Sequence, residues 1–230
     1  MKRQLDFFIT GTDTNVGKTV VTAALLAGLR GTGVDAVAMK PVQTGALRGR
    51  SPDLDFCAKA SGWKISRDEY DDLCPYRFSM PASPHLAARK AGKKIEPGKI
   101  IAAFRRLQQR HESVLVEGSG GLLVPMGANF YQRDLIVMIG LPVIVVARPG
   151  LGTLNHTLLT VEALRAKEIR VVAVVLSSTL PQRRDEIGAD NEKFLQKKLL
   201  PIRVMRLPFI AGNRGRHSVF AKLTAHALKE

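Results

Sequence analysis

The segment Gly11–Thr19, with the sequence GTDTNVGKT, lies between two apolar stretches of the chain. A strand, a glycine-bounded loop and Gly-Lys-Thr at the start of a helix together present backbone N–H groups to phosphates. In such a loop Lys18 places a charge at the terminal phosphates and Thr19 offers its hydroxyl to Mg²⁺. Five residues rather than four separate Gly11 from Gly17. The alternative is a tight turn with a solvated lysine, but the apolar flanks favour a nucleoside triphosphate site.

Short apolar runs rich in β-branched residues alternate with helical stretches along the chain. The expected strands are Leu5–Thr10, Val34–Lys40, Val114–Glu117, Pro142–Ala147, Val171–Ser177 and Ile202–Leu207. The expected helices are Lys18–Arg30, Leu54–Ala60, Pro84–Ala91, Pro97–Arg110, Tyr131–Ile139, Leu154–Ala166, Ile187–Lys198 and Ser218–Leu228. This order predicts an α/β fold of the P-loop NTPase type, a mostly parallel sheet with helices on both faces. At 230 residues, we expect a single domain spanning residues 1–230.

Charge and cysteine content constrain the partners and the compartment. The formal net charge of +15 raises nucleic acid or an anionic surface as partners, but the basic residues are scattered, and three tyrosines and one tryptophan offer little for base stacking. The longest apolar run, Leu141–Ala147, is too short to cross a bilayer. Cys57 and Cys74 form no C-x-x-C motif, and the start of the chain lacks the apolar core of a signal peptide. We expect a cytoplasmic protein without nucleic-acid or membrane partners.

Two further strand ends carry charged residues. Lys40 ends the second expected strand and would point into the same crevice as Lys18, where a second cation stabilises the charge that develops in phosphoryl transfer. Glu117 ends the third strand and precedes the glycine turn Gly118–Gly121. An apolar strand ending in an acid is the Walker-B arrangement, which delivers a carboxylate to the metal held by Thr19. A surface lysine and an ordinary turn are the alternatives.

Three expected helix starts can be interpreted either as helix caps or as parts of a binding site. Ser51 or Asp53 caps the helix after the second strand, or Asp53 or Asp55 supplies a carboxylate to Mg²⁺. The segment Ser83–His85 has the pattern of a capped helix start with proline at its first position. Residues 148–156 form a glycine-rich turn that opens a helix, which suits a carboxylate or a phosphate as well as simple capping.

In their order, these segments resemble the dethiobiotin synthetases, a family of P-loop enzymes of biotin synthesis. The extra residue of the phosphate-binding loop belongs to the family's pattern. The resembling motifs, spread over about two thirds of the chain, are GTDTNVGKT (11–19), KPVQTG (40–45), PYRF (75–78), PASPHLAA (81–88), VEGSGGLLVP (116–125) and LPVIVVARPGLGTLNHTLLT (141–160).

The resemblance implies an ATP- and Mg²⁺-dependent ring closure by a homodimer. The substrate 7,8-diaminopelargonate takes up CO₂, supplied by bicarbonate, to give a carbamate; ATP phosphorylates the carbamate, and the second amine closes a cyclic urea. The loop at residues 150–155 would bind the carboxylate of the diamino acid across the dimer interface.

The resemblance also implies roles for individual residues. The implied catalytic residues are Lys18, Lys40 and Thr44. The implied nucleotide-binding residues are Thr14, Asn15, Val16, Gly17, Lys18, Thr19, Val20, Ser177 and Pro208. The implied substrate-binding residues are Thr14, Lys40, Thr44, Gly118, Gly120, Gly150, Leu151, Gly152 and Asn155. The implied metal-site residues are Thr19, Asp53 and Glu117, with Asp53 preferred to Asp55 because its distance from Gly62 fits the family's pattern better.

Two departures from the family's pattern bear on nucleotide recognition. Asn15 replaces a common glutamate and removes a negative charge from the loop. Ser177 stands where an asparagine commonly pairs with adenine, so the choice of base is open, while Leu207–Phe209 matches a second loop on the base side. The alternative from another class is a partition-type ATPase that binds DNA or membrane. It would carry a basic amphipathic helix at the C-terminus, and Ser218–Glu230 has no strong basic face.

Overall fold

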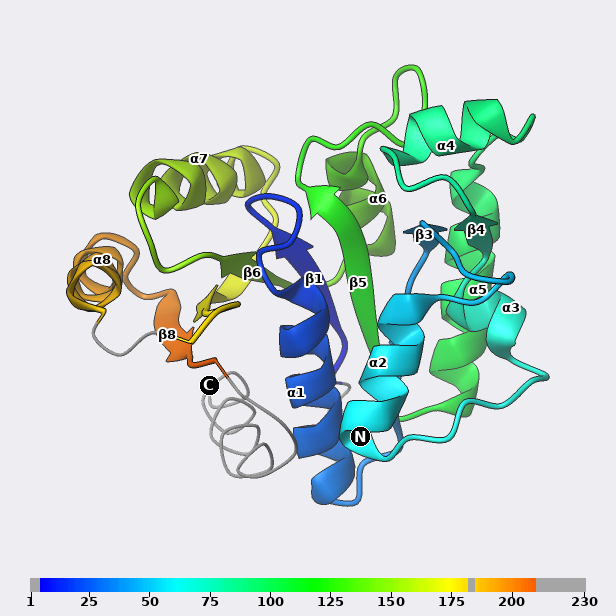
Figure 1. The fold of residues 1–230 in the computed structure, drawn as a ribbon, viewed down its shortest axis with the longest axis horizontal. Coiled ribbons are helices and arrows are strands. Elements are labelled where there is room, and N and C mark those ends of the chain that lie inside the picture. Colours follow the sequence, from blue (N-terminus) through cyan, green and yellow to red (C-terminus); the bar gives the residue numbers. More distant parts are fainter. Residues whose placement is uncertain (1–4, 182–184, 210–230) are drawn as a thin grey trace.

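The computed structural model describes residues 5–181 and 185–209. Its main feature is a six-stranded parallel sheet with the strand order β2-β5-β1-β6-β7-β8 (Figure 1). The strands are β1 (Phe7–Gly11), β2 (Ala36–Met39), β5 (Ser113–Gly121), β6 (Val143–Ala147), β7 (Val171–Ser177) and β8 (Arg203–Leu207). All six predicted strands are present. Only β5 is much longer than expected, because its glycine stretch stays paired with β1, Gly121 lying opposite Gly11.

Seven of the eight predicted helices are present, with ends within two residues of those expected. They are α1 (Lys18–Gly31), α2 (Pro52–Ser61), α4 (Pro84–Lys90), α5 (Pro97–Arg110), α6 (Gln132–Ile139), α7 (Thr153–Arg165) and α8 (Glu186–Lys198). The eighth, Ser218–Leu228, lies outside the described residues. Figure 1 shows α1 in front of the sheet and α6 behind it, so helices cover both faces as predicted. Across the described ranges, no helix combines the length and apolar character needed to cross a membrane.

Strand β1 lies in the interior of the sheet, paired with β5 on one side and β6 on the other. The chain leaves β1 toward one edge of the sheet and later returns to build the other edge. In open α/β sheets, ligands bind outside the carboxyl ends of the strands at such a reversal. Ile9 of β1 lies opposite Glu117 of β5, so the loop after β1 begins close to the acid predicted in the metal site.

A second, two-stranded parallel sheet was not predicted from the sequence. It pairs β3 (Val42–Thr44) with β4 (Tyr76–Phe78), and a one-turn helix, α3 (Tyr70–Leu73), precedes β4. Three-residue strands are too short to show a periodic pattern. Through this small sheet, β3 places Thr44 in the wall of the cavity described below.

Candidate active site

The predicted phosphate-binding loop joins β1 to α1 and places the amino end of α1 at the loop, where backbone N–H groups and the helix dipole favour anions. Its glycines are required by geometry. Gly17 has a φ of 98° and packs so closely against Ser177 that a side chain would collide with it. A Cβ on Gly11 would lie 2.9 Å from Nζ of Lys18. Lys18 itself donates a hydrogen bond of 2.9 Å to the Asp13 carbonyl, across the loop.

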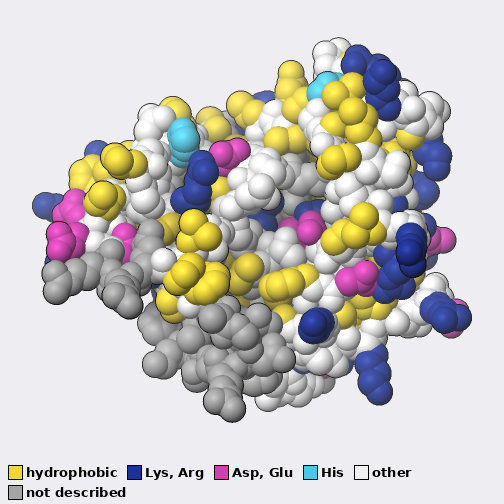
Figure 2. Space-filling view, in the orientation of Figure 1, with side chains coloured by type: hydrophobic (Ala, Val, Ile, Leu, Met, Phe, Trp, Pro, Cys, Tyr) yellow, Lys and Arg dark blue, Asp and Glu magenta, His cyan; other side chains and the backbone are white. Residues whose placement is uncertain are grey.

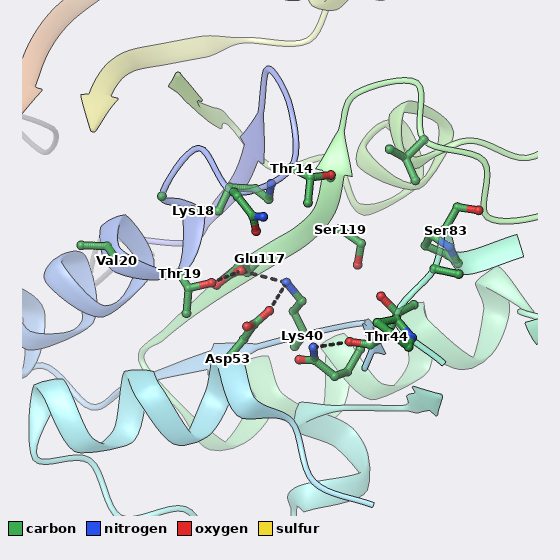
Figure 3. Close-up of a pocket in the computed structure, with 18 of the residues that line it drawn as sticks. Thr14, Lys18, Thr19, Val20, Lys40, Thr44, Asp53, Ser83, Glu117 and Ser119 are labelled. Atoms are coloured by element: carbon green, nitrogen blue, oxygen red, sulfur yellow. Dashed lines mark hydrogen bonds and ion pairs between the residues drawn. The ribbon is translucent and has the colours of Figure 1, made fainter. Parts of the chain in front are cut away.

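A cavity of about 830 Å³ extends from this loop along the end of β5. In Figure 3, Thr14, Lys18 and Thr19 lie on one side of it and Thr44 and Ser83 on the other. Acidic and basic side chains lie close together near the middle of the face shown in Figure 2. The cavity is lined by Thr14, Asn15, Gly17, Lys18, Thr19, Val20, Lys40, Gln43, Thr44, Asp53, Pro81, Ala82, Ser83, Pro84, Glu117, Ser119, Gly120, Val124 and Thr179. Its size suits a small-molecule ligand.

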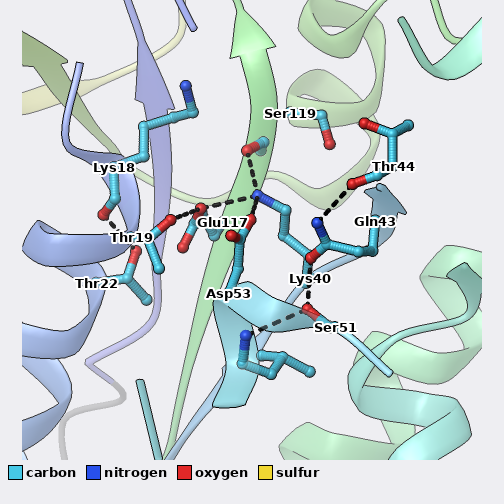
Figure 4. A network of polar contacts seen from close by, with 12 residues as sticks. Lys18, Thr19, Thr22, Lys40, Gln43, Thr44, Ser51, Asp53, Glu117 and Ser119 are labelled. Atoms are coloured by element: carbon cyan, nitrogen blue, oxygen red, sulfur yellow. Dashed lines mark hydrogen bonds and ion pairs between the residues drawn. The ribbon is translucent and has the colours of Figure 1, made fainter. Parts of the chain in front are cut away.

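The floor of the cavity holds a compact charged network centred on Lys40 (Figure 4). Its Nζ lies 2.6 Å from Oδ2 of Asp53 and 2.8 Å from Oε1 of Glu117, and it donates to the Gly118 carbonyl at 3.1 Å. The same Glu117 oxygen accepts a hydrogen bond of 2.8 Å from the Thr19 hydroxyl. The side chains of Lys40 and Glu117 are 5% and 3% exposed. The network therefore joins the start of α1, the end of β2, the start of α2 and the middle of β5.

The surroundings of the two cavity lysines shift their pKa values in opposite directions. Burial and, to a lesser degree, the neighbouring charge of Lys40 together lower the pKa of Lys18 from 10.5 to about 8, against a smaller opposing effect of Glu117. Burial alone would also lower the pKa of Lys40, but the charges of Glu117 and Asp53 outweigh it and raise that pKa above its ordinary value. Lys18 is thus the cation that lacks full compensation and gains most from an anionic ligand.

The donor set fits a hard divalent cation. Asp53 and Glu117 face one another across a single cation, the Lys40 ammonium, and the Thr19 hydroxyl lies beside them. Mg²⁺ prefers one or two carboxylates with phosphate oxygens and waters. Among the described residues, no cluster of three or more His, Cys, Asp and Glu side chains is arranged for a metal. This site therefore offers two carboxylates and a hydroxyl, and bound phosphate would complete it.

Asp55, the other candidate for the metal carboxylate, lies elsewhere. Its carboxylate pairs with Arg50 at 2.5 Å on the surface, whereas Asp53 lines the cavity. The Ser51 side chain caps α2 by accepting from the N–H of Leu54 at 3.2 Å, so Asp53 is not needed as a cap.

Most of the predicted site residues surround the cavity. The lining includes Thr14, Asn15, Gly17, Lys18, Thr19, Val20, Lys40, Thr44, Asp53, Glu117 and Gly120. The Gly118 carbonyl accepts a hydrogen bond from Lys40, and Val16 is fully buried behind the loop. Ser177 is buried beneath Gly17, and Pro208 is exposed just beyond β8. The cavity lining within the described residues does not include the predicted loop residues Gly150, Leu151, Gly152 and Asn155.

Sequence reasoning missed Gln132, a residue that shapes this site from behind. Gln132 begins α6 and is 1% exposed. Its Oε1 accepts from the N–H of Ser119 at 2.5 Å, and its Nε2 donates to the Thr10 hydroxyl at 2.9 Å and to the Gly121 carbonyl at 3.1 Å. It therefore ties the glycine turn after Glu117 to the end of β1. A buried amide this far along the chain leaves no local sequence signal.

One expectation about a helix start is wrong. Pro84 does open α4, but the Ser83 hydroxyl does not cap the helix; it lies 3.1 Å from Nδ1 of His85. Ser83 and Ser119 both line the cavity and were not predicted as site residues. Serine is a preferred residue at helix N-caps, so the sequence around Ser83 alone cannot distinguish a capping residue from one that lines the cavity.

Comparison with known sequences places the chain among enzymes of one kind. A family model described as an AAA domain matches residues 6–211. The ATP-dependent dethiobiotin synthetase of Anaeromyxobacter sp. (strain Fw109-5) is 51% identical over 170 residues, which cover 74% of this chain and 75% of that protein. The protein of the same name from Anoxybacillus flavithermus (strain DSM 21510 / WK1) is 41% identical over 196 residues, covering 83% of this chain and 86% of the relative.

Comparison with solved structures bears on the fold alone. A putative plasmid partition protein of Borrelia burgdorferi B31, bound to AMPPNP, superposes with a TM-score of 0.62 at 10% identity, with 99% of each chain covered. The MinC:MinD complex of Aquifex aeolicus gives a TM-score of 0.60 at 12% identity, covering 96% of this chain and 94% of that one. These proteins share the P-loop architecture. The identity of the sequence relatives is far higher, and by that identity and coverage the chain belongs to the dethiobiotin synthetase family.

Proposed function

We propose that this chain catalyses the ATP-dependent synthesis of dethiobiotin from 7,8-diaminopelargonate and CO₂. One amine of the substrate takes up CO₂ to form a carbamate, and ATP phosphorylates the carbamate to a carbamic-phosphoric anhydride. The second amine then closes the cyclic urea and releases phosphate. The observation that supports this most is the position of Lys40, a buried cation that lines the cavity and is linked through one oxygen of Glu117 to Thr19 of the phosphate-binding loop.

In this proposal the two lysines act on different anions. Lys18, at the amino end of α1, would hold the terminal phosphates, and their charge would keep it protonated. Lys40 and the hydroxyls of Thr14 and Thr44 would hold the carbamate. Positioned cations stabilise the charge that develops as a phosphoryl group moves, and they need little reorganisation in a buried site.

The metal-site residues in this proposal are Thr19, Asp53 and Glu117. A bound Mg²⁺ would neutralise phosphate charge and orient the terminal phosphate for transfer. Thr19 can offer an oxygen lone pair to the metal while its hydroxyl continues to donate its hydrogen bond to Glu117, as it does in this structure.

We further propose that the enzyme is a cytoplasmic homodimer in which the loop at residues 150–155 serves the partner's site. Leu151, at the tip of this loop, is 91% exposed, and Gly152 adopts a φ of 84° as the cap of α7. A loop outside its own chain's cavity, with an exposed apolar tip and helix N–H groups behind it, suits a carboxylate bound across an interface.

Mixing two inactive chains is expected to restore activity. A Lys18→Ala chain lacks the phosphate contact, and a Gly152→Val/Asn155→Ala chain lacks the carboxylate contact, but a heterodimer of the two contains one intact site. Activity after co-refolding, measured against each variant alone, tests this. If tagged heterodimers are purified and remain inactive, the carboxylate is bound within one chain.

Relaxed selectivity for the nucleotide base is expected as well. Ser177 is 1% exposed beneath Gly17, and a short hydroxyl cannot span the N6 amine and ring nitrogen of adenine as an asparagine amide does. The phosphate contacts do not depend on the base. CTP or GTP should therefore support a substantial fraction of the ATP rate in steady-state assays at matched Mg²⁺. Strict dependence on ATP would place the selectivity in backbone groups near Leu207–Phe209, around Pro208.

The partition-type ATPase alternative is not favoured. Its structural likeness lies at 10–12% identity and reflects the shared fold, while the sequence relatives at 37–51% identity are dethiobiotin synthetases. The basic amphipathic helix expected of such an ATPase would lie at Ser218–Glu230, and this segment is outside the described residues. Our proposal involves neither nucleic acid nor a membrane.

A biotin auxotroph lacking its own dethiobiotin synthetase provides a test in cells. The gene for this chain should restore growth without biotin, and the Lys18→Ala variant, expressed at the same level, should not. Growth that depends on added dethiobiotin, despite soluble expression, would contradict the proposed function.

A further inference from the structure

Ser83 and His85 form a polar pair at the far side of the cavity from the phosphate-binding loop. The Ser83 hydroxyl lies 3.1 Å from Nδ1 of His85, and Ser83 lines the cavity. In Figure 3, Ser83 lies on the same side as Thr44 and away from Thr19. With Nε2 of His85 protonated, the hydroxyl donates to the Nδ1 lone pair, and a proton can pass from the cavity through Ser83 to the ring.

The local backbone fixes this pair in place. Pro84 between the two residues has a restricted φ and forms the first position of α4. The N–H of His85 donates to the Pro125 carbonyl at 3.2 Å, which ties α4 to the loop after β5. His85 itself is half-buried, so the residue is partly open to solvent.

The reaction proposed above needs such a proton acceptor. In ring closure the second amine forms a carbon–nitrogen bond and must lose a proton. The ionisable side chains among the described residues lining the cavity are Lys18, Lys40, Asp53 and Glu117. The lysines act there as cations, and both carboxylates are already engaged by Lys40. His85, one hydrogen bond behind Ser83 of the cavity wall, is the nearby group that can take up a proton.

We propose that Ser83 and His85 accept the proton released in ring closure, an inference that rests on the proposed function. The amine lone pair attacks the anhydride carbon, the new carbon–nitrogen bond forms, and the bond from that carbon to the phosphate oxygen breaks with its electron pair leaving on phosphate. The amine proton moves to Oγ of Ser83 as the hydroxyl proton moves to Nδ1 of His85. The imidazolium then releases a proton to solvent.

The test follows ATP cleavage and ring closure separately in one turnover. Rapid-quench reactions of wild type, His85→Asn and Ser83→Ala would measure ADP and dethiobiotin against time. Asparagine at position 85 retains a hydrogen-bonding group near Ser83 but takes up no proton, so it separates proton transfer from packing. Arg89→Ala, an exposed change one turn along α4, is the matched control. Melting temperatures confirm that each variant is folded.

We expect wild type and Arg89→Ala to form one dethiobiotin per ADP. In His85→Asn and Ser83→Ala, ADP should form at a near-normal rate while ring closure slows by about 10²-fold, the usual contribution of a positioned base. The waiting anhydride would hydrolyse, and the ratio of dethiobiotin to ADP would fall well below one.

A normal ring-closure rate in His85→Asn, with one dethiobiotin formed per ADP, overturns the inference whether or not Ser83→Ala is impaired. The proton would then go elsewhere, such as to the departing phosphate. Wild type that forms no dethiobiotin at all contradicts the proposed function instead. The two failures are therefore distinguishable.

Discussion

Replacing Lys18 by alanine is expected to lower turnover by about 10²-fold or more while the protein remains folded. Lys18 begins α1 at the phosphate-binding loop, and its ammonium is the cavity cation without a fully compensating partner. Removing a preorganised charge from a phosphoryl-transfer site typically costs about 10²–10³-fold in rate. Steady-state assays with circular dichroism as a check on folding measure both outcomes. Near-normal turnover would contradict the placement of the phosphates at this loop.

The same lysine is expected to destabilise the ligand-free protein. Its pKa falls from 10.5 to about 8 on folding. Between these two pH values Lys18 is therefore protonated in the unfolded chain and largely deprotonated in the folded one. The destabilisation is complete below about pH 8 and disappears as the pH rises toward 10.5. Lys18→Met, which retains most of the apolar stem, should raise the free energy of unfolding by about 2–3 kcal/mol at pH 7. Denaturant titrations at pH 7 and pH 10 would show this gain shrinking with pH; a gain that is equal at both would contradict it.

Replacing Glu117 by glutamine should produce the second largest loss. Glu117 is buried and accepts hydrogen bonds from both Lys40 and Thr19, so glutamine leaves a buried ammonium with less compensation. Breaking a buried ion pair from one side costs about 3–5 kcal/mol, which is an upper bound here because Asp53 still pairs with Lys40. Turnover should fall, and the Mg²⁺ concentration needed for half-maximal rate should rise.

Asp53→Asn and Asp55→Asn form a matched pair for the same metal site. Asp53→Asn should also raise the Mg²⁺ requirement, with a smaller loss of stability because its side chain is 28% exposed. Asp55→Asn removes only a surface pair with Arg50, typically worth under about 1 kcal/mol. Mg²⁺ titrations of activity separate the two. A raised requirement in Asp55→Asn alone would show that Asp53 was the wrong choice of carboxylate.

The parts of this site that the sequence could predict are those with a local signal. A strand followed by Gly-Lys-Thr, a lysine before proline and an acid before glycines all mark the carboxyl-terminal parts of parallel strands, which converge at one edge of a sheet, although β5 continues past Glu117 to Gly121. That convergence explains why Lys18, Lys40 and Glu117 meet although they lie far apart in sequence. Strands β1, β2 and β6 were predictable because each is a near-continuous apolar run buried on both faces.

The remaining features depend on contacts between distant segments. Asp53 and Asp55 are two residues apart on α2, so helix geometry turns them to nearly opposite faces without saying which one faces the cavity. The Gln132 amide meets Thr10 from 122 residues away. Similarly, Ser83 has the sequence pattern of a cap, and only the position of His85 and the cavity wall reveals its other partner.

The most direct test of the proposed function is the synthesis of dethiobiotin by the purified chain. The assay would contain 7,8-diaminopelargonate, ATP, Mg²⁺ and ¹³C-labelled bicarbonate, with product and ADP followed by mass spectrometry and a coupled assay. We predict dethiobiotin that carries one ¹³C atom in its ureido carbon, formed in equal amount to ADP and absent with Lys18→Ala. ATP hydrolysis without labelled dethiobiotin, in a folded protein and with the diamine present, would contradict the proposed function.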